Sequence, residues 1–131
     1  MKRARTIVVE DHAPFRAAIA DWLRGMDRAE VVGTFDSDQC TPRALAALRP
    51  DLVLLGVGIA AKANLSLVER IKAAASGAKL VVMSFFAVRE FEAAVLALGA
   101  DGFVPKDEVP ARLPVLLRRL FADAAPDCAS T

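Results

Sequence analysis

Four polar side chains of this 131-residue sequence have the chemistry of metal and phosphate binding: Glu10, Asp11, Ser84 and Lys106. Adjacent carboxylates can bind Mg²⁺, which takes a few carboxylates and keeps several of its waters. An ammonium group neutralises a phosphoryl oxygen, and a hydroxyl donates a hydrogen bond to another. The set therefore has the charges needed to hold a metal or an anion, but it has no nucleophile facing them.

Each of these residues lies near the end of a short apolar run, and the runs indicate what must position them. Strands that are apolar throughout, rather than alternating with polar residues, are typical of parallel sheets that are buried on both faces. The predicted strands are Thr6–Val9, Val31–Phe35, Leu52–Leu55, Leu80–Met83 and Gly102–Val104.

Between the predicted strands, apolar residues recur at helical spacing. The predicted helices cover residues 15–23, 44–48, 67–71, 88–98 and 109–120. Because the last of these contains Pro110 and Pro114, we expect its regular part to begin nearer Ala111 or to kink. Strict alternation of strands and helices predicts an α/β sandwich with a parallel sheet and right-handed crossovers.

In such a sheet, ligands bind beyond the carboxyl ends of the strands. This rule places five residues on one rim: Glu10, Asp11, Gly56, Ser84 and Lys106. With two carboxylates and one ammonium on that rim, we expect Lys106 to form a direct ion pair with Glu10 or Asp11. The Ser84 hydroxyl could bind a phosphoryl oxygen, but it is equally consistent with an ordinary strand-end hydroxyl that hydrogen-bonds the following turn.

Composition excludes several classes of protein. The chain is 55% hydrophobic and 25% charged with a net charge of +1, so no global charge favours nucleic acid or a membrane surface. Two cysteines (Cys40 and Cys128) and one histidine (His12) are too few for a disulfide framework or a zinc site. We interpret His12 as a structural residue and both thiols as unreactive. No apolar run reaches the roughly 18 residues of a membrane span, and we predict a cytoplasmic domain.

Four motifs in order resemble the receiver domains of bacterial two-component response regulators, over about residues 5–121. They are Ile7-Val8-Val9-Glu10-Asp11-His12, Arg49-Pro50-Asp51-Leu52-Val53-Leu54-Leu55, Val81-Val82-Met83-Ser84 and Gly99-Ala100-Asp101-Gly102-Phe103-Val104-Pro105-Lys106-Asp107. The last two are similar to receivers of the LuxR/FixJ-like subgroup. The resemblance implies a flavodoxin-like, doubly wound (βα)5 fold with strand order 2-1-3-4-5 and three layers. Residues 1–121 would form the receiver, and 122–131 a tail or the start of a linker.

The resemblance also implies roles for individual residues. Glu10 and Asp11 would help to bind Mg²⁺, with the backbone carbonyl of Gly58 as a further ligand. Lys106 would contact the phosphoryl group, and Ser84 and Phe103 would form the switch pair.

One position departs from the family pattern. The phospho-accepting aspartate would follow the run Leu52–Leu55, where this chain has Gly56. Glycine has no carboxylate, so it forms no acyl phosphate and contributes no metal ligand. We therefore expect a degenerate receiver with no cofactor beyond, at most, weakly bound Mg²⁺ at Glu10, Asp11 and Gly58.

Phe85 and Phe86 follow Ser84 directly, and neighbouring residues at a strand exit seldom both point into the core. An exposed ring there, together with Phe91, would form part of an apolar patch. We expect a homodimer or protein partner on the face built from the helix over 88–98, the strand over 102–104 and the helix over 109–120. The last helix is basic on one side, which we interpret as a solvated face; its arginines are Arg112, Arg118 and Arg119.

The sequence thus predicts a signalling module, not an enzyme, that acts by phosphorylation-independent protein contacts. It makes no direct contact with nucleic acid, although it would regulate a DNA-binding output domain absent from this sequence. One alternative is a working phosphorelay receiver that carries a substitution or uses another acceptor such as Asp11. A second alternative is a flavin- or nucleotide-binding α/β protein, although no Gly-x-Gly-x-x-Gly or Gly-x-x-x-x-Gly-Lys-Ser/Thr motif follows a strand.

Overall fold

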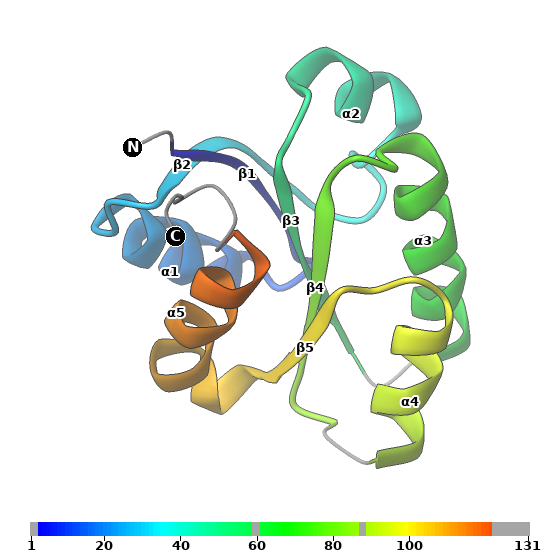
Figure 1. Ribbon diagram of the computed structural model, residues 1–131. Helices are drawn as coiled ribbons and strands as arrows, with labels where there is room; N and C mark the ends of the chain where they lie inside the picture. The colour runs from blue at the N-terminus through cyan, green and yellow to red at the C-terminus, as the bar shows by residue number, and fades with distance from the viewer. Residues whose placement is uncertain (1–2, 59–60, 87–88, 122–131) are drawn as a thin grey trace, which may run out of the picture.

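A computed structural model of the chain describes residues 3–58, 61–86 and 89–121, with the side chains of residues 61–64 excepted. The predicted tail 122–131 and Cys128 lie outside these residues. Strands and helices alternate along the chain (Figure 1), in the order β1 (Ala4–Val9), α1 (Ala13–Arg24), β2 (Ala29–Phe35), α2 (Pro42–Leu48), β3 (Leu52–Val57), α3 (Ala61–Ala74), β4 (Lys79–Ser84), α4 (Arg89–Ala97), β5 (Gly102–Pro105), the 3-10 turn η1 (Lys106–Glu108) and α5 (Val109–Leu120).

All five strands are parallel, and their order in the sheet is β2-β1-β3-β4-β5. Helices α1 and α5 cover one face of the sheet, while α2, α3 and α4 cover the other (Figure 1). This confirms the predicted flavodoxin-like α/β fold, its three layers and its strand order.

Burial on both faces explains the apolar runs. Along β3, Val53 and Leu55 pack toward α2 and α3, whereas Leu52 and Leu54 pack toward α1 and α5. All four are almost fully buried. Successive side chains of a strand point to opposite faces, so a strand buried on both sides needs an apolar residue at every position.

The helix ends follow local chemistry. Helix α1 begins after His12, whose Nδ1 accepts a hydrogen bond from the backbone N–H of Phe15 at 3.3 Å, which confirms a structural role for His12. Helix α2 ends at Leu48 because Pro50 follows, and Arg49 takes a left-handed conformation there. After α4, Gly99 has a φ of 110°, which a residue with a side chain rarely adopts.

The last helix does not begin near Ala111, which was one of the two outcomes expected for it. Helix α5 begins at Val109 and continues through Pro114 to Leu120. Pro110 lies in the first turn, where its missing N–H would have no partner within the helix. Helix α5 buries Val109, Leu113 and Leu117 against the sheet, and this packing compensates for the hydrogen bond that Pro114 does not donate.

Candidate functional site

The carboxyl ends of β1, β3, β4 and β5 form the predicted rim. In the sheet, Val57 of β3 pairs with Ser84 of β4, and Ser84 pairs with Pro105 of β5. Strand β3 runs two residues beyond its predicted end, so Gly56 lies within it rather than after it. Lys106 is the residue after Pro105, so it lies beside the ends of β3 and β4.

The predicted ion pair forms with Glu10. The ammonium of Lys106 lies 2.7 Å from Oε1 of Glu10, and the two side chains are 7% and 4% exposed. The other oxygen, Oε2, accepts a hydrogen bond of 2.9 Å from the backbone N–H of His12. Oε1 has no hydrogen-bond partner among the described residues, so the ion-pair contact with the ammonium is what neutralises its charge.

The backbone of Glu10 is also fixed. Its N–H donates to the carbonyl of Phe35 at 2.8 Å, and its carbonyl accepts from the guanidinium of Arg16 at 2.7 Å. These bonds tie the end of β1 to β2 and to the first turns of α1. The backbone of Glu10 is thus held in place by hydrogen bonds, and its side chain extends to Lys106 at the end of β5.

The carboxylate of Asp11 is turned toward a different part of the molecule. Its two oxygens accept hydrogen bonds from Ser37, one from the backbone N–H at 2.7 Å and one from the hydroxyl at 3.0 Å. Ser37 lies in the loop between β2 and α2. The structure therefore does not bring both carboxylates to Lys106, and the role of Ser37 has no signal in the sequence.

Two aromatic rings lie against the Lys106 ammonium. Its Nζ is 4.8 Å from the ring centroid of Phe15 and 5.6 Å from that of Phe85, within range of a cation–π interaction. The two rings also contact each other, with centroids 6.1 Å apart. In the sequence, Phe15 is only the first residue of the helix predicted over 15–23. Its place in the first turn of a helix that follows β1 was the signal that it borders the rim.

Ser84 is fully buried, and its Oγ accepts a hydrogen bond of 2.9 Å from the backbone N–H of Phe86. This is the turn-bonding arrangement considered for a strand-end hydroxyl. The ring of Phe103 is buried and packs edge-on against Phe91, at a centroid distance of 6.1 Å. Phe91 in turn packs against Phe86 at 5.8 Å.

Both rings at the exit of β4 are exposed, Phe85 by 70% and Phe86 by 43%, which confirms that the core does not accommodate them. Phe91 is buried and contacts Phe86. Because Phe85 contacts α1 and Phe86 contacts α4, the two rings lie on different sides of this loop.

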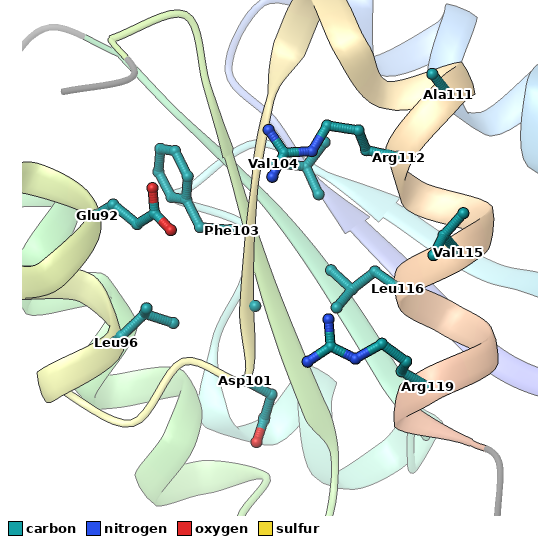
Figure 2. Close-up of a pocket in the computed structure, with 11 residues that line it drawn as sticks. Glu92, Leu96, Asp101, Phe103, Val104, Ala111, Arg112, Val115, Leu116 and Arg119 are labelled. Carbon is teal, nitrogen blue, oxygen red and sulfur yellow. The ribbon is translucent and has the colours of Figure 1, made fainter. Parts of the chain in front are cut away.

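A groove of about 420 Å³ lies between α4 and α5, with β5 at its floor (Figure 2). Leu96 of α4 and Val115 of α5 contribute exposed apolar side chains. Figure 2 shows the guanidinium groups of Arg112 and Arg119 on the α5 side and the carboxylate of Glu92 on the α4 side. The groove lies on the face expected to contact a partner, but Phe85, Phe86 and Phe91 do not line it.

As placed, the rim residues do not fit a magnesium site. Glu10 is paired with Lys106, Asp11 is bonded to Ser37, and Gly56 has no carboxylate. Within the described ranges, no three Asp, Glu, His or Cys side chains lie close enough to hold a metal ion. At the rim, the Glu10 carboxylate and the Lys106 ammonium therefore neutralise each other, and two aromatic rings lie against the ammonium.

Cys40 lies outside this rim and is buried. Burial raises the pKa of its thiol above the usual value, and the nearby charge of Arg70 offsets part of that rise. A buried thiol with a raised pKa carries little thiolate at neutral pH, in agreement with the expected lack of reactivity. Among the described helices, none is both long and apolar enough to cross a bilayer.

Comparison with known proteins adds the family context. Residues 6–118 match the family described as the response regulator receiver domain. The chain is 28% identical over 118 residues to the response regulator GacA of Pseudomonas viridiflava, covering 90% of this chain and 55% of GacA. It therefore spans about half the length of this curated relative.

Two solved structures share the fold. The non-phosphorylated receiver domain of the stress response regulator RcsB from Escherichia coli has a TM-score of 0.80 at 21% identity, covering 99% of both chains. A LuxR-family two-component response regulator from Aurantimonas sp. SI85-9A1 has a TM-score of 0.81 at 20% identity, covering 93% of this chain and 87% of that one.

Proposed function

This chain belongs to the response regulator receiver domain family, and we propose that it signals without being phosphorylated at the end of β3. It is a receiver domain of the two-component type. In our proposal it acts in the cytoplasm by binding proteins rather than by catalysis. As the sequence motifs imply, we place it in the LuxR/FixJ-like subgroup, where it would regulate a DNA-binding output domain outside this sequence.

The observation that carries the proposal is Gly56. This residue lies in the penultimate position of β3, beside the Glu10–Lys106 ion pair. An acyl phosphate needs a carboxylate at that point, and glycine supplies none. Asp11, the other carboxylate near the rim, is held by two hydrogen bonds from Ser37.

The proposed switch residues would then remain in one arrangement. Ser84 bonds the turn that follows it, and Phe103 is packed inward against Phe91. Without a phosphoryl group to attract the hydroxyl, nothing at the rim favours a second position for either side chain. In this proposal a protein partner, and not phosphate, selects the conformation of the α4–β5–α5 face.

The groove between α4 and α5 supports a second copy of this chain as the partner. Its positive charges, Arg112 and Arg119, lie on α5, while Glu92 lies across the groove on α4. In a two-fold dimer, the α5 of one copy would face the α4 of the other, which brings opposite charges together around Leu96 and Val115. Sedimentation at high protein concentration tests this part, and a monomer throughout would overturn it.

Intact-mass spectrometry tests the central claim. The chain is incubated with a small-molecule phosphodonor and Mg²⁺, and we expect its mass to stay unchanged. A stable adduct of one phosphoryl group would overturn the proposal, and peptide mapping would show whether Asp11 or another residue had accepted it.

The Gly56→Asp variant is the matched comparison. It supplies the missing carboxylate, and its Cβ displaces the Glu10 side chain from above position 56, so it should gain a phosphoryl adduct under the same conditions. An adduct on this variant alone would show that the assay detects acyl phosphate and that Gly56 is the reason for its absence in the natural chain.

A further inference from the structure

The space above Gly56 is already filled. A Cβ atom added at this position would overlap Oε1 of Glu10 and would lie 2.8 Å from the carboxyl carbon of that residue. It would also lie 3.4 Å from Cε of Lys106. Two residues further on, a Cβ added at Gly58 would meet no atom of the described residues within 4 Å. The Glu10 carboxylate therefore occupies the volume in which any side chain at position 56 would begin.

The carboxylate is held there from two sides. Oε2 accepts the backbone N–H of His12, and Oε1 contacts the ammonium of Lys106. Both partners are fixed in turn, since His12 caps α1 and Lys106 follows the end of β5. A buried ion pair is favourable only when its geometry is good and its remaining polar atoms are satisfied. Here Oε2 has a hydrogen-bond donor, whereas Oε1 is neutralised by the ion-pair contact with the ammonium and has no hydrogen-bond partner among the described residues.

The rings of Phe15 and Phe85 cover another side of the same ammonium, at 4.8 Å and 5.6 Å. Phe85 stays largely exposed, yet it contacts both Phe15 and Lys106. An aromatic cover excludes water and strengthens the attraction between the two charges beneath it. An anion arriving from solvent would have to displace the carboxylate beside these rings.

We infer that Glu10 is a tethered counterion that takes the place of the missing side chain at position 56 and closes the Lys106 site to external anions. The ammonium keeps the position of an anion-binding group, but a carboxylate from the same chain saturates it. Because a tethered group competes at a high effective concentration, a free anion at ordinary concentrations does not displace it. The inference deepens the proposed function and rests on it, since it states what occupies the rim in place of phosphate.

Removal of the tether is the direct test. In Glu10→Ala, the space over Gly56 becomes empty and Lys106 loses its counterion, so inorganic phosphate should bind there. Thermal unfolding is followed while phosphate is titrated in the absence of metal, with sodium chloride at matched ionic strength as the reference. We expect a saturable rise in Tm for Glu10→Ala, with half-saturation at least tenfold below any seen for the natural chain. The double variant Glu10→Ala/Lys106→Met should lose this rise.

Equal phosphate binding by the natural chain and Glu10→Ala would overturn the inference, as would a folded Glu10→Ala that binds no phosphate. The phosphodonor experiment distinguishes the two proposals. A phosphoryl adduct on the natural chain would overturn the proposed function, whereas an unmodified chain together with no phosphate binding by Glu10→Ala would overturn only the tethered counterion.

A second pair of variants keeps the inference testable if Glu10→Ala does not fold. Gly56→Ala adds a methyl group that forces the carboxylate away from Lys106, whereas Gly58→Ala adds the same group in open space. The acylation rate of the Lys106 amine is measured by peptide mapping. We expect it to rise at least tenfold in Gly56→Ala and to stay unchanged in Gly58→Ala. Equal rates in the natural chain and in Gly56→Ala would overturn the inference.

Discussion

At the rim, the ammonium of Lys106 lies 2.7 Å from the carboxylate of Glu10, and less than a tenth of either side chain is exposed. At the edge of the groove, Arg112 lies 3.3 Å from Glu108, and about half of each side chain is exposed. The first pair is shielded from water by aromatic rings, whereas the second is solvated.

The two regions therefore differ in how easily their charges change partners. In a water-poor environment an ion pair is strongly attracted and costly to break, because each separated charge would remain desolvated. Exposed charges exchange partners at little cost. The charges at the rim are thus fixed and neutralise each other, whereas the charges beside the groove are free to change partners. This difference favours the groove as the place where a partner binds.

Lys106→Met tests whether the rim ion pair is as strong as its burial implies. The substitution leaves the buried Glu10 carboxylate without its counterion, so the free energy of unfolding should fall by about 3–5 kcal/mol. Urea denaturation measures the loss. The double variant Glu10→Gln/Lys106→Met removes both charges and should recover a large part of it. A loss below about 1 kcal/mol for Lys106→Met would mean that the rim pair behaves like a surface pair.

Val115→Glu tests the other side of the comparison. A charge in the apolar part of the groove should weaken self-association at least tenfold, or about 1.4 kcal/mol, as measured by sedimentation equilibrium. Because Val115 is exposed, the free energy of unfolding should stay within about 0.5 kcal/mol of the natural value. Ala17→Glu adds the same charge on an exposed position of α1 and serves as the control. Unchanged association in Val115→Glu would remove the groove from the dimer interface.

Lys72→Met tests an ion pair whose burial lies between those of the other two pairs. The Lys72 ammonium lies 3.1 Å from the Asp101 carboxylate, and about a quarter of each side chain is exposed. It also donates to the carbonyl of Ala78 at 3.2 Å. Removing these contacts should lower the free energy of unfolding by about 1 kcal/mol in urea. A loss as large as that of Lys106→Met would show that burial does not separate the two pairs.

Arg112→Ala should have the smallest effect. The Arg112–Glu108 pair spans one helical turn in solvent and contributes about 0.3–0.5 kcal/mol. Salt screens such a pair, so the difference from the natural chain should disappear in urea titrations at high ionic strength. A salt-independent loss above about 1 kcal/mol would show that the groove arginine has a structural role like that of Lys106.

Much of the fold could be predicted from local patterns. The run Leu52–Leu55 is apolar at every position, and the structure confirms a central strand buried on both faces. Helix α5 begins at Val109 rather than near Ala111, because a proline penalty read from sequence does not include the packing of Val109, Leu113 and Leu117 on the sheet.

At the candidate site, the residue types were predictable but most of their partners were not. Parallel strands bring their carboxyl ends to one edge, so Lys106 and the two carboxylates were expected near each other. Glu10 and Asp11 are adjacent in sequence, and consecutive residues of an extended chain point to opposite sides. Which of them would reach Lys106 depended on the β2–α2 loop, where Ser37 bonds Asp11.

The order of residues is enough to predict the alternation of strands and helices, the rim on which the polar residues lie, and the lack of a carboxylate at Gly56. It takes the folded chain to show that the Glu10 carboxylate lies over Gly56, beside Lys106 and its two aromatic rings, and that the exposed charges of α4 and α5 border a groove. The physical reason is that a side chain's type is local, whereas its neighbours and its burial come from elements that are distant in sequence. Those neighbours decide whether a charge is neutralised within the chain or remains exposed to bind another molecule.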